Sequence, residues 1–188
     1  MRFDVVTLFP EIFSAVRDCG ITARARMRGL WSMNCWNPRD TATDLHRTID
    51  DRPFGGGPGM VMMAEPLAQT IDAVRASGNR GPILSFAPNG ARLTDARVRE
   101  IAAAKEPIVL VCGRYEGIDE RFLESYVDEV VSLGDFVLSG GELPACALID
   151  AVVRQLPGAI KDLSASDESF ATGLLDAPHY TRPEVWRG

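Results

Sequence analysis

The amino-acid sequence predicts an α/β fold: a mainly parallel sheet with helices on both faces. Apolar runs with strand character alternate along the chain with segments of helical periodicity. The run at residues 108–112 is apolar at every position, as in a central strand covered on both faces. Glycine-bearing turns follow several of the strand runs, which is where a parallel sheet changes from strand to helix.

Five strands and five helices are expected. The strands are predicted at residues 3–8, 30–36, 82–86, 107–112 and 127–133. The helices are predicted at residues 10–17, 65–76, 94–104, 118–126 and 142–155. Thr94 is suited to cap its helix, and Pro66 and Pro144 fit first-turn positions. Two long segments, 37–59 and 156–188, lack regular periodicity, and loops of this length in a compact domain are usually functional or disordered.

The length and composition are those of one globular domain. The chain has 188 residues, of which 46% are hydrophobic. No stretch approaches the ~20 apolar residues of a membrane span. The N-terminal segment carries Asp4 and Glu11 where a signal peptide needs an apolar core. We therefore expect a cytoplasmic protein that does not enter a membrane.

The cysteines and histidines do not predict a metal site. The four cysteines, at positions 19, 35, 112 and 146, form no Cys-x-x-Cys pair, and the two histidines are isolated in the sequence. Each cysteine lies in or beside an apolar run, which favours buried free thiols.

Charge is unevenly distributed along the chain. The net charge of −6 argues against a general polyanion-binding protein. Residues 17–52 nevertheless hold seven arginines against five acids, whereas residues 125–150 hold five acids and no lysine or arginine. A phosphate backbone suits the first segment and a cationic ligand suits the second, although ordinary surface charge explains both on composition alone.

Three glycine-bearing loops are expected to meet at one edge of the sheet. They lie at residues 87–90, 113–117 and 134–141, each directly after a predicted strand. Open α/β sheets bind ligands at the carboxyl edge of their strands, and glycines allow the backbone to approach a ligand closely. The sequence has neither a dinucleotide fingerprint after the first strand nor a P-loop. A small ligand with a cationic centre fits these loops better than a phosphate does.

Five segments carry a resemblance to a known family. They read TLFPEIF (7–13), RPFGGGPGM (52–60), GRYEGIDER (113–121), SLGDFVLSGGELP (132–144) and PHYTRPEVW (178–186). In this order they resemble the signature segments of the bacterial tRNA (guanine-N1)-methyltransferases of the SPOUT superfamily. The resemblance covers essentially the whole chain.

The resemblance implies a fold and a reaction that spacing alone does not show. It implies a deep trefoil knot, one of the rare exceptions to unknotted topology. It implies methyl transfer from S-adenosylmethionine to N1 of guanine 37, beside the tRNA anticodon, when a guanine precedes it. Its partners are tRNA and a second copy of the chain, in a homodimer with active sites across the interface. Whether Mg2+ takes part is left open.

The resemblance assigns a donor pocket to the three loops. Replacing Gly140 or Gly141 with valine is expected to fill space that the donor needs. The expected donor-binding residues are Pro88, Gly113, Tyr115, Glu116, Leu133, Gly134, Phe136, Val137, Leu138, Gly140, Gly141 and Pro144.

The resemblance also implies the groups that act on the guanine. Its N1 carries a proton at neutral pH, so a general base must remove it. The family places an aspartate before a Ser-Phe pair, but here Glu168 precedes Ser169 and Asp167 stands one position earlier. Either carboxylate is a candidate base. Arg154 is expected to stabilise charge on O6, although an exposed helix-terminal arginine needs no such role.

The domain organisation follows from the same resemblance. Residues 1–157 are expected to form the knotted donor-binding domain, and residues 158–188 the active-site loop and the start of an interdomain linker. The resemblance implies that family members continue into a helical tRNA-binding domain, which we do not expect within these 188 residues.

Two rival interpretations remain at this point. A non-catalytic RNA-binding module needs no donor pocket and is expected to show a broad basic face. A SPOUT methyltransferase with another RNA target shares the fold but not the guanine-type signature segments. Binding of S-adenosylmethionine separates an enzyme from a binding module.

Overall fold

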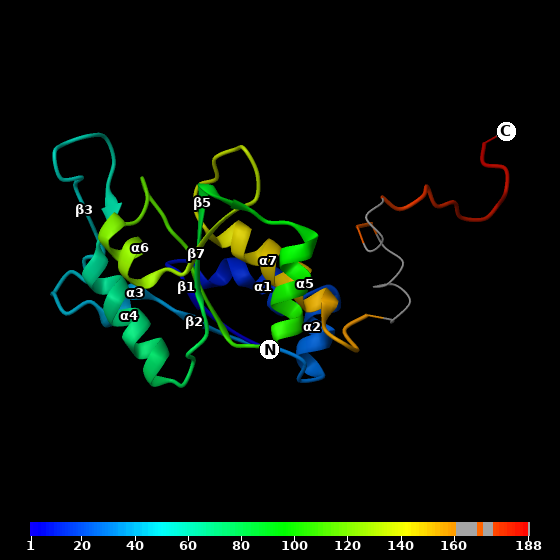
Figure 1. Ribbon diagram of the computed structural model, residues 1–188, viewed down its shortest axis with the longest axis horizontal. Coiled ribbons are helices and arrows are strands. Elements are labelled where there is room, and N and C mark those ends of the chain that lie inside the picture. Colours follow the sequence, from blue (N-terminus) through cyan, green and yellow to red (C-terminus); the bar gives the residue numbers. More distant parts are fainter. Residues whose placement is uncertain (161–168, 171–174, 188) are drawn as a thin grey trace.

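The computed structural model describes residues 1–160, 169–170 and 175–187, and within them five parallel strands form one sheet (Figure 1). The α/β fold with a mainly parallel sheet is thus confirmed. Across the sheet the strands follow the order β2 (Ser32–Trp36), β1 (Arg2–Val6), β6 (Ile108–Val111), β5 (Ile83–Arg92) and β7 (Glu129–Ser132). Because all five are parallel, their carboxyl ends meet at one edge.

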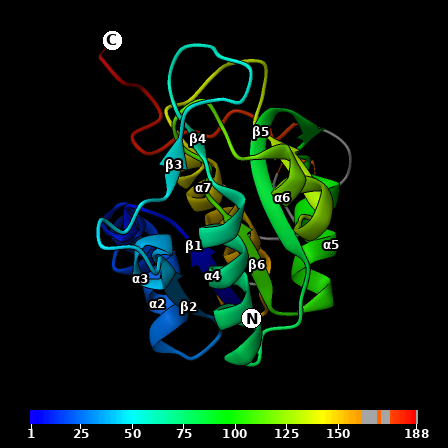
Figure 2. The same ribbon diagram turned by 90° about the vertical axis from the view of Figure 1, so that its left-hand side faces the viewer.

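Helices cover both faces of the sheet, so the domain has three layers (Figures 1 and 2). One face carries α4 (Ala64–Ala76) and α6 (Glu120–Tyr126), with the short α3 (Pro38–Thr41) beside α4. The other face carries η1 (Pro10–Phe13), α1 (Ser14–Arg17), α2 (Gly20–Met27), α5 (Asp95–Ala104) and α7 (Glu142–Gln155).

The central strand β6 separates two hydrophobic cores. Ile108 and Leu110 belong to the core under α5 and α7, while Val109 and Val111 belong to the core under α4. All four side chains are at most 3% exposed. Strand side chains alternate between the two faces, so a strand that is buried on both needs apolar residues at every position.

Some predicted elements differ from the observed ones. Helix 10–17 is two short pieces, η1 and α1. The predicted strand 82–86 instead continues as β5 to Arg92. Helix α2 was not predicted, nor was the small antiparallel hairpin of β3 (Asp50–Asp51) and β4 (Val61–Met62). The loop that connects β3 and β4 projects past the body of the domain (Figure 1, cyan).

The remaining compositional expectations have mixed outcomes. Cys112 is buried, and Cys35 and Cys146 are partly buried, but Cys19 is exposed, so burial of all four thiols was wrong. Burial, followed by the charge of Glu142, raises the pKa of Cys146 to about 11. In the described part of the chain no three His, Cys, Asp or Glu side chains are placed to hold a metal ion. None of its helices combines the length and apolarity needed to cross a bilayer.

A buried carboxylate ties strand β1 to the edge strand β2 and to Asn79. Asp4 on β1 is 0% exposed and forms an ion pair with Arg2 at 2.7 Å. It also accepts hydrogen bonds from Asn79 at 2.8 Å, Trp36 at 2.8 Å and Asn34 at 3.2 Å. Burial alone would raise its pKa, but these donors together outweigh burial and lower the pKa of Asp4 below its ordinary value.

Replacing Asp4 with alanine is expected to lower the free energy of unfolding by ~3–5 kcal/mol, because the buried donors of Asn79 and Trp36 lose their acceptor. Since the folded-state pKa is lowered, this contribution is complete above the unfolded pKa of about 3.9 and is lost as pH falls through the folded value. Urea unfolding at pH 7 and below pH 4 checks both points. Asp18→Ala, at an exposed pair with Arg17, is the control and is expected to change stability little. Equal effects of the two substitutions would contradict the account.

Candidate functional site

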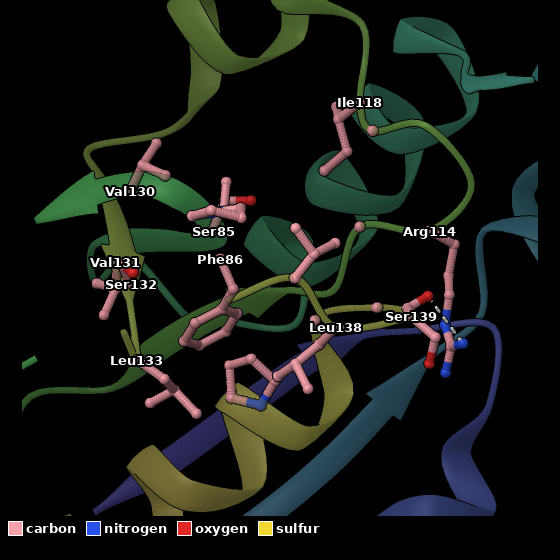
Figure 3. A pocket seen from close by; sticks show the side chains of 18 of the residues that line it. Ser85, Phe86, Arg114, Ile118, Val130, Val131, Ser132, Leu133, Leu138 and Ser139 are labelled. Atoms are coloured by element: carbon pink, nitrogen blue, oxygen red, sulfur yellow. Dashed lines mark hydrogen bonds between the residues drawn. The ribbon is translucent and has the colours of Figure 1, made fainter. Parts of the chain in front are cut away.

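A pocket of about 300 Å³ opens at the carboxyl edge of the sheet, where the ends of β5, β6 and β7 meet (Figure 3). Three loops, at residues 113–117, 133–141 and around Pro88, form its walls, as expected for an open α/β sheet. The volume lies at the lower end of the range for small-molecule sites. The three loops predicted to converge therefore do so.

The pocket brings together all twelve residues predicted to bind the donor. Twelve further lining residues were not predicted, because they belong to strands or to the helix predicted at 118–126, or were taken as ordinary loop residues. The further lining residues are Ser85, Phe86, Ala87, Arg114, Gly117, Ile118, Glu120, Leu123, Val130, Val131, Ser132 and Ser139. Contact with a donor stays a prediction for every one of these residues.

Strand β5 places Pro88 at the pocket by means of a bulge. Its pairing with β7 shifts in register between Phe86 and Ala91, and the intervening residues bend out of the regular ladder. Proline has no N–H to donate, so within a sheet it is found at edges and bulges. The turn expected at 87–90 is thus an irregularity inside a strand.

The loop after β6 is held against the β3–β4 hairpin. The N–H of Glu116 donates to the Met60 carbonyl at 2.9 Å, and the N–H of Met62 donates to the Gly117 carbonyl at 2.9 Å. A Cβ on Gly59 would overlap the Glu116 side chain, so a glycine lets these segments touch. The glycine-rich segment 52–60, which had no place in the predicted fold, therefore supports one wall of the pocket.

Tyr115 adopts a left-handed conformation, with φ of 59°, and the residue is 46% exposed. Partial burial, together with a hydrogen bond and charge from Asp50, raises its pKa, against an opposing effect of Arg39. A non-glycine residue in this region is strained unless its surroundings hold it there. Interactions of Tyr115 with Asp50 and Arg39 hold it in this conformation.

The loop after β7 packs tightly against the end of β6. The N–H of Gly141 donates to the Gly113 carbonyl at 2.9 Å. A Cβ on Gly141 would lie 2.7 Å from Cys112 Cα, and one on Gly140 would overlap Arg114. Neighbouring protein atoms thus leave no space for a side chain at these two positions. The expected reason was different, namely that the donor occupies this space.

An ion pair lies at the centre of these contacts. Arg114 Nε is 2.8 Å from Glu142 Oε2, at angles too poor for a hydrogen bond. The other carboxylate oxygen of Glu142, Oε1, accepts from the Thr7 hydroxyl at 2.9 Å. Glu142 is 1% exposed and lies in the first turn of α7, where the helix dipole favours a negative charge. Arg114 falls inside a signature segment, but nothing in the sequence pointed to its partner.

The acid-rich stretch does not make an acidic pocket. None of the acids in 125–150 lines the pocket, and Glu142, next to the lining residue Gly141, is paired with Arg114. The carboxylates that line the pocket itself are those of Glu116 and Glu120, both exposed. Among the lining residues the structure describes, Arg114 is the one cation. The pocket thus suits a ligand that has apolar parts, polar groups that face the backbone of the loops, and a positive charge close to Glu116 and Glu120.

Of the three residues expected to act on the base, the structure describes one, Arg154, and it lies apart from this pocket. Asp167 and Glu168 lie outside the described residues. Arg154 is partly buried in the last turn of α7, whereas Pro144 in the first turn lines the pocket. Helix rise puts Arg154 roughly 18 Å along the axis from Glu142. One chain therefore does not bring Arg154 to its own donor pocket.

Comparison with known proteins gives a consistent result. The family model described as tRNA (Guanine-1)-methyltransferase TrmD matches residues 1–188. A tRNA (guanine-N(1)-)-methyltransferase of Thiobacillus denitrificans is 62% identical over 100% of this chain and 81% of that protein. One from Pseudomonas syringae pv. tomato is 57% identical over 99% of this chain and 75% of that protein.

A solved structure agrees with the sequence relatives. The tRNA (m1G37) methyltransferase from Aquifex aeolicus superposes with a TM-score of 0.84 at 39% identity, covering 100% of this chain and 78% of that one. With a family model that spans every residue and relatives well above half identical, this chain belongs to the tRNA (guanine-1)-methyltransferase family.

Proposed function

We propose that this chain transfers a methyl group from S-adenosylmethionine to N1 of guanine 37 in tRNA. The observation that carries the proposal is the pocket at the carboxyl edge, which gathers the twelve residues that the family resemblance predicts to bind the donor, in a family whose relatives are named for this chemistry. A tRNA substrate would place the reaction in the cytoplasm.

The pocket fits the donor by size, backbone and charge. Its loops present glycine backbone at Gly113, Gly134 and Gly140, and a Cβ at Gly134 would lie 2.8 Å from the Phe136 ring. The charge of Arg114 is offset by Glu142, so the described lining residues include no unpaired cation to repel a sulfonium.

In the proposed reaction the bound donor supplies an activated methyl group, and the protein supplies orientation and charge placement. The loops at residues 113–117 and 133–141 would hold the donor, whose chemistry is to supply the methyl group. Asp167 or Glu168 removes the N1 proton, with Glu168 the better match to the motif. The guanidinium of Arg154 stabilises the negative charge that develops on O6.

We propose the knotted topology as part of the same assignment. The support for it is the path of the chain after β7, which is the outermost strand on one side of the sheet. From there the chain turns back over the carboxyl ends of the strands. The chain then starts α7 beneath the loop that follows β6, where Gly141 bonds to Gly113. Residues 1–157 would form this knotted domain and residues 158–188 the active-site loop and linker. The described residues 175–187 are exposed and lack helix and strand.

The proposed function is tested by methyl transfer to tRNA transcripts. The chain is incubated with S-adenosylmethionine and transcripts that carry either guanine or adenine at position 37, after a guanine at 36. We expect N1-methylguanosine from the first transcript and no product from the second. Methylation of a ribose, or of guanine elsewhere in both transcripts, would favour the rival with another RNA target.

The distance between Arg154 and the pocket supports a homodimer with sites across the interface. A second copy can supply the arginine that one chain keeps roughly 18 Å away. The segments that border the pocket also expose large apolar side chains, as interaction surfaces do. They are Phe9, Phe136, Val137, Leu138 and Leu143.

Sedimentation velocity at micromolar concentration is expected to show a species of twice the 20.5 kDa chain mass. Replacing Leu143, which is 54% exposed in the first turn of α7, with glutamate is expected to shift the population toward monomer. Leu175→Glu, at a 73% exposed position in the C-terminal segment, is the control and should leave the population unchanged. A wild-type protein that stays monomeric at every concentration would contradict the dimer.

Replacing Arg154 with alanine is expected to lower the rate of methyl transfer by about 100-fold or more while donor binding persists, since charge stabilisation by one group contributes that much. Single-turnover kinetics with tRNA and calorimetry with the donor measure the two effects separately. Arg28→Ala, at an exposed arginine whose side chain bonds to the Gly158 carbonyl, is the control. A rate within twofold of wild type in Arg154→Ala would remove Arg154 from the mechanism.

A further inference from the structure

Arg114 connects its own loop to two segments that are far from it in sequence, the one after β1 and the one from Ser139 to Glu142. Its guanidinium lies 4.4 Å from the centre of the Phe9 ring, which follows β1. One of its terminal nitrogens, Nη1, donates to the Ser139 carbonyl at 3.2 Å, in the loop after β7 (Figure 3). Its Nε faces Glu142 at 2.8 Å in the first turn of α7. The side chain is 17% exposed, so these contacts lie largely out of water.

The partner of Arg114 is itself fixed from behind. Glu142 is 1% exposed and accepts a hydrogen bond from the Thr7 hydroxyl at 2.9 Å. The same hydroxyl oxygen accepts from the Phe9 N–H at 3.0 Å. Thr7, Glu142 and Arg114 thus form a chain of polar contacts that runs from the end of β1 to the pocket wall. A charge buried in this way is costly unless it keeps its partner.

The loop that carries the contact contributes more residues to the pocket than either of the other two loops. Between Ser132 and Glu142 it has no helix or strand, and Phe136, Val137 and Leu138 all expose their side chains. At Gly140 the backbone lies directly against the Arg114 side chain, with no room for a Cβ. Arg114 is therefore the side chain against which this loop is shaped.

We propose that Arg114 is a positioning residue, which acts through Glu142 and the Ser139 carbonyl to hold the loop at residues 133–141 in its donor-binding shape. A guanidinium suits this role because its planar fork can face a carboxylate and a carbonyl at the same time and stack on an aromatic ring. The inference rests on the proposed function, since it concerns affinity for S-adenosylmethionine at the same pocket.

Lysine at position 114 keeps the charge but offers a single ammonium in place of the fork, so it cannot make all three contacts at once. For Arg114→Lys we expect the KM for S-adenosylmethionine to rise about tenfold, with kcat at saturating donor within about threefold of wild type. Loss of one charge-assisted contact, about 1.4 kcal/mol, corresponds to that factor of ten. The KM for tRNA is expected to stay unchanged. A general loss of folded protein would lower kcat and leave both KM values alone.

A matched control exists on the same loop. Arg92 pairs with Asp135 at 3.0 Å, but the two side chains are 63% and 90% exposed. Such surface pairs contribute little. Arg92→Lys is therefore expected to leave the KM for the donor unchanged. An equal rise in KM for Arg92→Lys and Arg114→Lys would overturn the special role of Arg114.

Glu142→Gln separates positioning from direct contact. If Arg114 acts through Glu142, removing the negative charge is expected to raise the KM for the donor several-fold while urea unfolding remains cooperative. A normal donor KM in Glu142→Gln with a raised one in Arg114→Lys would mean that Arg114 binds the donor directly, and would overturn the proposal. A wild-type protein without donor binding would instead overturn the proposed function itself.

Discussion

Replacing Gly141 with valine is expected to abolish binding of S-adenosylmethionine. Even a single Cβ at this position would lie 2.7 Å from Cys112 Cα and 3.0 Å from the Gly113 nitrogen. These are backbone atoms at the end of a central strand and cannot yield as a flexible side chain can. The start of α7 and the loops on both sides of the pocket must therefore move apart. Isothermal titration calorimetry with the donor is the measurement.

The control for this variant is Ala103→Val, at an exposed position of α5 that does not line the pocket. It adds a bulkier side chain at a surface position of a helix and is expected to keep donor binding. The unfolding midpoint of Gly141→Val shows whether the variant is folded at the titration temperature. A folded Gly141→Val that binds the donor with wild-type heat would disprove the close-packing argument. Gly140→Val is expected to weaken binding less, because there the obstacle is the Arg114 side chain.

The double variant Asp167→Asn with Glu168→Gln is expected to lose methyl transfer by ~100-fold to 10,000-fold, the contribution typical of a general base. Donor binding should persist, since neither residue is among the twelve predicted to bind the donor. Single-turnover kinetics with tRNA measure the rate of the chemical step. Near-wild-type rates in the double variant would refute the carboxylate-base mechanism.

The two single variants are expected to differ from each other. Aspartate and glutamate differ by one methylene, which moves the carboxylate by about 1.5 Å at most. A misplacement of about 1 Å can cost about 100-fold in rate, so the two residues are not interchangeable. We expect Glu168→Gln to reproduce most of the loss and Asp167→Asn to cause little. The reverse pattern would assign the base to Asp167.

Elements with several agreeing signals could be predicted from the sequence. The helix predicted at 94–104 is observed as α5, with the Thr94 hydroxyl accepting from the Arg97 N–H at 3.3 Å as a cap does. The helix predicted at 142–155 is observed with the same bounds. Both combine helical periodicity with a suitable first turn, so local preference and core packing favour the same structure.

Elements that depend on a neighbour were missed. In α2 only Thr22 and Ala25 are buried, so the helix presents almost no apolar stripe to detect. Pro88, Asn89 and Gly90 read as a turn, but pairing of β5 with β7 resumes beyond them at Ala91. Turn-forming residues can be carried by a bulge when an adjacent strand holds both sides of it, and that strand is distant in sequence.

The location of the site could be predicted from the sequence, but the contacts between its charged side chains could not. The convergence of three loops follows from parallel strands, and all twelve residues predicted to bind the donor line one pocket. The acid-rich stretch, however, was misleading as a guide to charge in the pocket. Four of its five acids have partners elsewhere in the fold: the Ile83 N–H for Asp128, Arg97 for Glu129, Arg92 for Asp135 and Arg114 for Glu142.

The central claim is that the donor occupies the pocket between the ends of β5, β6 and β7. The most direct measurement is a crystal structure of the chain grown with S-adenosylmethionine at a concentration well above its Kd. The account predicts the donor between the loops at residues 113–117 and 133–141, in contact with Pro88 and Glu116. A donor bound elsewhere on the chain, or this pocket without donor in a protein that calorimetry shows to be saturated, would contradict it.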